Sequence, residues 1–479
     1  MDAAIPTVDF PLIVHGEGYL QRGERRIPIA SITAERTKYR PDLPWQIRLR
    51  LGECDHNILD AVLSAPGELP DVEGMAEDGR SLRIKGFDWR KHSGRTLNGT
   101  ASELALGSET LHATPERLYL TALLTDNPLA QPLAGSLLPK RNGSVVARLS
   151  YPPARIKTQL GTADFWAGYV DERIFIGSKN ARAERNVPII QIKLTKRRRG
   201  IPLPDIIERL QGELSDMTRL LTLLSRRHVG CFEISATARW RDSAGRSHLH
   251  TAELWQEAPE ALAETRDNPL VNARQMQPGA LDTLYQRFRL SPHKEVIGRV
   301  AMYLAEAFHQ TYIETQTLYA FTAFEALVNA LGEHAPNFVM EKAAFRKLRK
   351  RLEGGIKNAA AECGLTVSQV REINNKLGEL HRRPFLTRSV EVVNALGINW
   401  RDLWPGVDNI ETALRSGYSR RSTFVHTGDL ENPDASARDV IRFAALSERI
   451  VYALLEGDEA WLAPIRWHRM PHDIEAKTS

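Results

Sequence analysis

The spacing of apolar residues changes near residue 200, and this change limits the folds open to the chain. In segment 45–51 apolar residues alternate with polar ones, as in a half-buried strand. In segment 206–224 apolar residues recur every three or four positions and form one helical face. Segments 65–80 and 125–143 are rich in Pro, Gly and polar residues, which predicts loops. We therefore predict an α+β fold, with strands first and helices last.

The 479 residues are too many for one ordinary core, so we expect several packed parts. The basic stretch KRRRGIPLPD, at 196–205, marks the first boundary. Apolar and polar residues alternate at 232–240 and again at 247–255, on either side of the DSAGR turn, which predicts a β-hairpin. The first predicted region, 1–200, is a β-rich N-terminal sensor or regulatory domain, and the second, 201–275, is a helix-plus-hairpin connecting module. An all-α helical bundle follows at 276–462, and a C-terminal tail at 463–479.

Composition and charge restrict the class of protein. A hydrophobic fraction of 42%, with 26% charged residues, is that of a soluble globular protein, and no apolar run is long enough to span a membrane. The three cysteines, Cys54, Cys231 and Cys363, lie far apart and form no CxxC pair. This pattern argues for a reducing compartment and against a structural zinc site. The N-terminus lacks a signal-peptide pattern. We therefore expect a cytoplasmic protein with no bound metal or cofactor.

The most informative motif is RRSTFVHTGDL, at 420–430, because it combines arginine and histidine beside a Gly-Asp break. The motifs GxxxxGK[ST], GxGxxG after a strand, HExxH and GxSxG are missing from the sequence, which argues against ATPases, Rossmann enzymes and α/β-hydrolases. On an ideal helix, Arg421 and His426 lie about 140° apart. A catalytic pair therefore needs a helix that bends or ends between them, or a second copy of the motif. The alternative is a solvated helix end.

The chemistry of this pair suits cleavage of a phosphodiester. A histidine moves protons near neutral pH, and an arginine holds phosphate oxygens and stabilises the charge of the transition state. RNA carries its own nucleophile, the 2′-OH, so such a site needs no metal ion.

Two further helices carry candidate residues. In the apolar segment 311–331, Glu325 and Asn329 form a polar stripe that faces either water or a site. In the next helix, a narrow apolar stripe is surrounded by basic residues that can meet a polyanion or can form a solvated face. The basic residues singled out as RNA contacts are Lys342, Arg346, Lys347, Arg349 and Lys350.

The RRSTFVHTG stretch resembles the R-x4–6-H signature of HEPN domains, in which a polar residue follows the arginine and a glycine trails the histidine. The matching positions are Arg421, Ser422, His426 and Gly428. The stretch LYAFTAFEALVNAL, at 318–331, is similar to the early helix of such domains, and Glu325 falls where many members keep an acid. Some members have a basic residue four positions later, whereas this chain has Asn329.

The layout is also similar to that of ApeA-like bacterial defence proteins, with a β-rich first half and a C-terminal HEPN bundle. This resemblance implies a metal-independent endoribonuclease that acts as a homodimer or higher oligomer and commonly cuts tRNA or mRNA. It implies that Arg421 stabilises phosphate and that His426 transfers a proton or activates the 2′-OH, with Glu325 as the third catalytic candidate. Arg420 is either an RNA contact or a solvated neighbour of the motif. A phage-derived trigger is the expected partner. The alternative is a non-catalytic HEPN module that binds nucleic acid or protein.

Overall fold

The structure is a computed structural model, and the chain forms two compact units. The first comprises Met1–Leu290 with Asp458–Ala463, and the second comprises Ser291–Gly457 with Pro464–Ser479. The described residues are 12–36, 44–54, 56–63, 69–93, 95–107, 117–125, 136–139, 145–148, 154–176, 179–186, 189–193, 203–241, 244–256, 258, 270–271, 276–277, 279–430, 432–457 and 462. Part of the predicted junction at 196–205 and the whole predicted tail at 463–479 lie outside them.

The first unit is built on strands. They are β1 Leu12–Arg22, β2 Arg25–Arg36, β3 Trp45–Leu51, β4 Asp71–Ala76, β5 Ser81–Lys85, β6 Asp88–Ser93, β7 Thr96–Ala101, β8 Glu103–Gly107, β9 Arg117–Leu124, β10 Ser136–Pro139, β11 Val145–Arg148, β12 Ala154–Lys157, β13 Thr162–Ile176, β14 Lys179–Asn186, β15 Ile189–Lys193, β16 Cys231–Arg241 and β17 Ser247–Gln256. Antiparallel pairing runs continuously through β6, β7, β3, β2, β1, β4, β5, β8, β17, β16, β9, β15 and β13.

Alternation explains why these segments become strands. In β3 every second residue from Trp45 to Leu51 is buried and the residues between are exposed, as the sequence predicts. The core beneath β1 to β8 contains the fully buried Leu20, Ile27 and Trp45. Helix α1, at His56–Leu63, lies against β2. Apolar burial on one face therefore sets the register, and the polar residues are left on the other face.

The predicted helix and hairpin of 201–275 are present, but they are part of the first unit. Helix α3, at Leu203–Ser225, packs on β16 and β17. Strand β16 pairs with β9, and β17 pairs with β8, so the hairpin continues the N-terminal sheet. Helix α4, at Ala280–Leu290, also belongs to this unit. Buried Tyr285 of α4 donates a hydrogen bond to Glu213 Oε2 of α3 at 2.6 Å.

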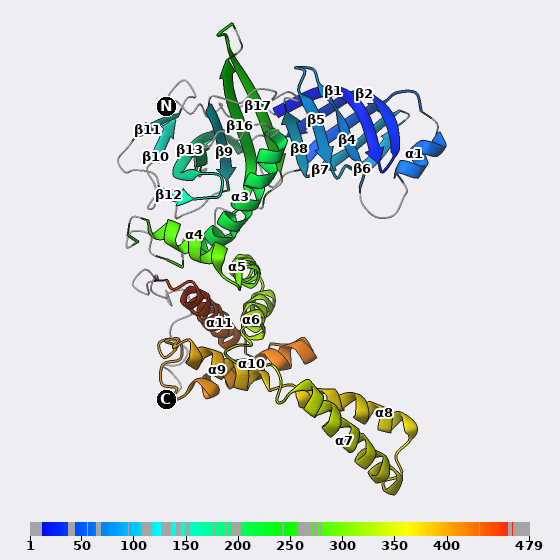
Figure 1. The fold of residues 1–479 in the computed structure, drawn as a ribbon, viewed down its shortest axis with the longest axis vertical. Helices are drawn as coiled ribbons and strands as arrows, with labels where there is room; N and C mark the ends of the chain where they lie inside the picture. The colour runs from blue at the N-terminus through cyan, green and yellow to red at the C-terminus, as the bar shows by residue number, and fades with distance from the viewer. Residues whose placement is uncertain are drawn as a thin grey trace. The chain divides into compact units, whose positions relative to one another are not determined.

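The second unit is helical in its described part. Its helices are α5 Lys294–His309, α6 Ile313–Ala330, α7 Lys342–Glu362, α8 Val367–Lys376, the short 3₁₀ helix η1 Leu377–His381, α9 Phe385–Ala395, α10 Ile410–Thr427 and α11 Pro433–Leu454. Helix α6 contacts α5, α9, α10 and α11 (Figure 1). An aromatic cluster explains this central place: the buried Phe443 ring of α11 lies 4.1 Å from Phe321 and 5.4 Å from Phe324, centre to centre.

Helices α7 and α8 lie side by side, set apart from α6, α9, α10 and α11 (Figure 1). At their base Val339 N donates to His381 O, and the His381 ring stacks on Phe338 at 4.5 Å and on Phe345 at 4.3 Å. The sequence pattern of Thr366 followed three residues later by Gln369 predicts a capping box, and this box is present at the start of α8. The sequence predicts that this helix continues to the proline at 384, but α8 ends at Lys376 and η1 follows. The low helix propensity of the preceding asparagines and of the glycine in η1 favours this earlier end.

The described residues therefore form a mixed α+β protein, as predicted. None of the described helices is both long and apolar enough to cross a bilayer.

Candidate functional site

Arg421 and His426 lie on one continuous helix. Helix α10 begins after Asn409, whose side chain accepts a hydrogen bond from Thr412 N at 2.8 Å, and it continues to Thr427. It ends at Gly428, which adopts the left-handed conformation with φ 73°. The break therefore comes after the histidine, so the helix does not bend or end between Arg421 and His426.

Arg421 and Glu325 are brought together by the contact between α10 and α6. Arg421 Nη2 lies 3.3 Å from Glu325 Oε1 and 3.4 Å from Oε2. The two side chains keep 26% and 25% of their surfaces exposed, so the pair opens to solvent. Arg421 Nε is buried and has no hydrogen-bond acceptor among the described residues. Glu325 therefore faces the arginine of the motif.

Tyr418 completes this group from the preceding turn of α10. Its hydroxyl donates to Glu325 Oε1 at 2.9 Å, and its ring stacks on Phe385 of α9 at 5.0 Å. Burial, then the negative charge of Glu325 and the hydrogen bond to it, raise the pKa of Tyr418 above its ordinary value. The tyrosine thus stays a neutral donor and fixes the orientation of the carboxylate.

His426 lies apart from this group in the single chain. It is exposed in the last turn of α10, and it makes no hydrogen bond or ion pair with any residue that the structure describes. The preceding residue, Val425, is 48% exposed as well. Because α10 is continuous, His426 points about 140° away from Arg421 around the helix. One chain therefore does not assemble the predicted pair.

Arg420 has a different environment from Arg421. Its Nε and Nη2 donate to Asp439 at 2.7 and 2.9 Å, and its Nη1 donates to Ser416 at 2.8 Å. The Asp439 side chain on α11 is only 2% exposed. Removing this arginine would leave a buried carboxylate short of a partner. The geometry gives Arg420 a role in joining α10 to α11, and its predicted contact with RNA stays a prediction.

Arg388 on α9 is a charged residue near Tyr418 that lies outside the R-x4-H motif. Its Nη2 donates to Asn329 Oδ1 at 2.7 Å, and its Nη1 donates to Asn337 Oδ1. Its guanidinium also lies over the Phe385 ring, 5.6 Å from the centre. Burial lowers the pKa of Arg388. Asn329 stands where some HEPN domains have a basic residue, four positions after the acid, and here Arg388 of another helix places a basic group beside it. Residue spacing within one segment cannot predict this contact, because the two residues are far apart in the sequence.

The predicted basic helix is α7, and its charged side chains are exposed. Arg349 Nε pairs with Glu353 Oε1 at 2.8 Å, whereas Lys342, Arg346, Lys347 and Lys350 make no ion pair with a described residue. Only Phe345 and the alanine at 360 are buried in this helix. Lys342, Arg346 and Lys350 follow at four-residue steps, which turn by about 40° each and keep all three on one face.

Within the described part of the chain, no group of three His, Cys, Asp or Glu side chains gathers closely enough to hold a metal ion. In comparisons with known proteins, the chain matches no family model and no curated protein.

Proposed function

We propose that this chain is a metal-independent endoribonuclease whose C-terminal helical unit is a HEPN bundle that works as a dimer. In this proposal, Arg421 of one copy meets His426 of the other. Such an enzyme acts in bacterial antiviral defence or as a toxin-like effector, with the β-rich unit as a sensor of a phage-derived trigger. The observation that carries the proposal is the contact of Glu325 on α6 with Arg421 and Tyr418, which lie on the helix that ends just after His426.

The proposed reaction is an attack by the ribose 2′-OH on the adjacent phosphorus. His426 takes the proton of the 2′-OH, the 2′-oxygen bonds to phosphorus, and the bond from phosphorus to the 5′-oxygen breaks. The leaving 5′-oxygen takes a proton from water, and the hydroxide that remains takes the proton held by His426. The products carry a 2′,3′-cyclic phosphate and a 5′-OH. Arg421 stabilises the negative charge that builds on the phosphate oxygens.

Three features of the site support these roles. The buried Arg421 Nε lacks an acceptor, which costs about 1–3 kcal/mol, and a bound phosphate can relieve this cost by reorienting the guanidinium. Glu325 pairs with the arginine, and Tyr418 donates a hydrogen bond to the Glu325 carboxylate. His426 is exposed and unpaired among the described residues, as a group that reaches a second chain must be.

The basic face of α7 supplies the proposed RNA contact outside the catalytic group. A helix of 21 residues is about 32 Å long, so Lys342, Arg346 and Lys350 can follow several successive phosphates. Lys347 and Arg349 lie beside this face and add to its positive potential. This arrangement also favours the second candidate function, a HEPN module that binds RNA without cutting it.

Cleavage in the presence of EDTA separates these two functions. Full-length protein is incubated with mixed cellular RNA and EDTA, beside Arg421→Ala, His426→Ala and the control Arg415→Ala, which removes an exposed arginine from the same helix. The proposal predicts cleavage by the wild type and the control, with a loss of at least about a hundredfold in the two site variants. RNA binding without cleavage in all four proteins would support the binding module instead.

A further inference from the structure

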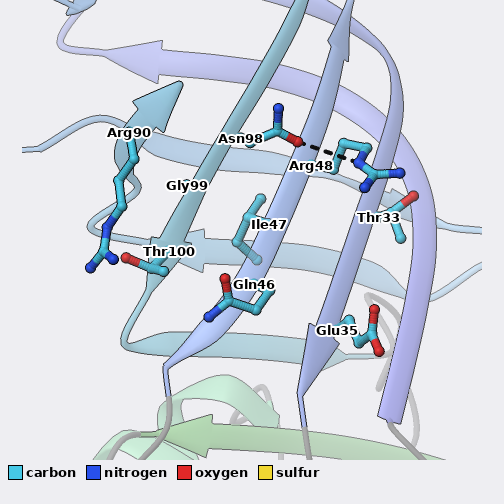
Figure 2. A pocket seen from close by; sticks show the side chains of 9 residues that line it. All are labelled: Thr33, Glu35, Gln46, Ile47, Arg48, Arg90, Asn98, Gly99 and Thr100. Atoms are coloured by element: carbon cyan, nitrogen blue, oxygen red, sulfur yellow. Dashed lines mark hydrogen bonds between the residues drawn. The ribbon is translucent and has the colours of Figure 1, made fainter. Parts of the chain in front are cut away.

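A hollow lies on the polar face of the N-terminal sheet, far along the chain from the motif residues (Figure 2). It crosses β2, β3 and β7 and reaches β6, and it encloses about 270 Å³. Its lining residues are Thr33, Glu35, Gln46, Ile47, Arg48, Arg90, Asn98, Gly99 and Thr100.

Strand register gathers these polar groups. Gln46 and Arg48 are two of the three exposed residues of β3, whose alternate residues enter the core. One row across the sheet pairs Arg48 with Thr33 of β2 and with Asn98 of β7. The next row pairs Gln46 with Glu35 and Thr100 in the same way. The side chains of each row therefore stand next to one another on the same face.

Two guanidinium groups flank the hollow. Arg48 Nε donates to the neutral Asn98 Oδ1 at 3.3 Å. Arg90 sits at a bulge of β6, where the pairing with β7 slips between Trp89 and Lys91. Figure 2 shows Arg90 on one side and Arg48 on the other, with Gln46 and Thr100 between them. No ion pair among the described residues involves either arginine.

We infer that this hollow binds a small phosphorylated ligand, such as a mononucleotide or a sugar phosphate. Two arginines and one glutamate leave it with a net positive charge, and a guanidinium matches a phosphate through paired hydrogen bonds. Gln46, Asn98 and the hydroxyl of Thr100 offer both donors and acceptors, and Glu35 can accept hydrogen bonds from sugar hydroxyls. The lining contains no aromatic ring, so stacking on a nucleic-acid base is not provided.

The size of the hollow agrees with this class. Sites for drug-sized ligands run from roughly 300 to 1,000 Å³, so a hollow of about 270 Å³ suits a smaller molecule. This inference concerns the β-rich unit and does not depend on the ribonuclease proposal.

Calorimetric titration of the full-length protein tests the inference. The probes are AMP and glucose 6-phosphate, with adenosine, glucose and inorganic phosphate as comparisons. We expect AMP or glucose 6-phosphate to bind at least about tenfold more tightly than its unphosphorylated counterpart and than inorganic phosphate. Arg48→Ala and Arg90→Ala should each weaken that binding by about tenfold or more. Arg25→Ala, which removes an exposed arginine of β2 outside the lining, should leave it unchanged.

Both site variants change exposed side chains, so thermal unfolding should show that they remain folded. Equal affinity for the phosphorylated and unphosphorylated probes would overturn the inference, as would the absence of binding by either phosphorylated probe. Phosphate-dependent binding that both variants retain unchanged would place the ligand elsewhere and overturn it too.

Discussion

Glu325 on α6 and Arg421 on α10 form an ion pair with 3.3 Å between Oε1 and Nη2. The pair links Glu325 of the central helix α6 to the arginine of the R-x4-H motif, 96 residues later in the chain. The same carboxylate accepts a hydrogen bond from Tyr418. Its place beside the motif arginine makes the role of Glu325 testable.

Replacing Glu325 with glutamine should separate catalysis from stability. Because the pair is partly exposed, Glu325→Gln should lower the free energy of unfolding by only about 1 kcal/mol or less. It should lower the rate of RNA cleavage by roughly tenfold or more, because Arg421 loses its orientation. The control Glu411→Gln breaks an exposed ion pair between Glu411 and Arg415, both on α10. It should change neither the free energy of unfolding nor the rate of RNA cleavage. Unchanged cleavage in Glu325→Gln would remove this residue from the site.

Tyr418 predicts a change in stability at alkaline pH. Its pKa is raised in the folded state, so above about pH 10 the unfolded chain releases this proton while the folded chain keeps it. The unfolded state then binds fewer protons, and stability falls as pH rises, by up to about 1.4 kcal/mol per pH unit from this group. In Tyr418→Phe this contribution should vanish, which urea unfolding between pH 9 and 11 measures.

The urea experiment has its own internal comparison. Tyr285 in the first unit also has a raised pKa, because of burial and its hydrogen bond to Glu213. Tyr285→Phe should therefore remove a similar part of the fall in unfolding free energy with rising pH. An identical pH slope in the wild type and Tyr418→Phe would mean that Tyr418 is not buried against Glu325 in solution.

Arg388→Lys should destabilise the helical unit although the charge is kept. Lysine cannot reproduce the fork that bonds to both Asn329 and Asn337, so the free energy of unfolding should fall by about 2 kcal/mol. The control Arg401→Lys changes an exposed arginine that lies over Trp400 and should cost less than about 0.5 kcal/mol. Equal effects of the two substitutions on urea unfolding would contradict this account.

The basic face of α7 should control the salt dependence of RNA binding. The double variant Arg346→Gln with Lys350→Gln removes two charges, so the slope of log affinity against log salt should become shallower by about 1.4 for single-stranded RNA. The double variant Arg371→Gln with Lys376→Gln removes the same charge from exposed positions of α8 and should leave the slope nearly unchanged. Fluorescence anisotropy at several salt concentrations measures both slopes, and indistinguishable slopes would exclude α7 as the RNA contact.

Local patterns predicted individual elements well. The alternation in β3, the helical period of α3 and the capping box of α8 each depend on residues close in sequence. Strands β4 and β10 were missed, because their segments at 65–80 and 125–143 contain glycines and prolines. In β4 the reason is clear. There Gly74 is required by close packing: a Cβ would lie 2.0 Å from Glu17 O of the neighbouring strand. A glycine needed for contact between strands looks like a turn residue in the sequence.

The candidate site was only partly predictable for the same reason. The motif indicated Arg421 and His426, and the apolar context of α6 indicated Glu325. Whether Arg420 faced solvent depended on Asp439 in the next helix, whose carboxylate accepts hydrogen bonds from Nε and Nη2 of the guanidinium. Arg388 was invisible because its partners, Asn329 and Asn337, lie 59 and 51 residues away. Contacts of this range depend on tertiary packing, which residue spacing does not report.

A mixing experiment tests the central claim, that two chains share one site, most directly. Arg421→Ala and His426→Ala proteins, each inactive alone, are mixed in equal amounts, denatured and refolded together, and assayed for RNA cleavage in EDTA. A mixed dimer contains one site with both Arg421 and His426, so random pairing should restore about a quarter of the activity of wild-type protein treated in the same way. If the refolded wild type is active and mixed dimers form without any restored cleavage, the shared site is contradicted.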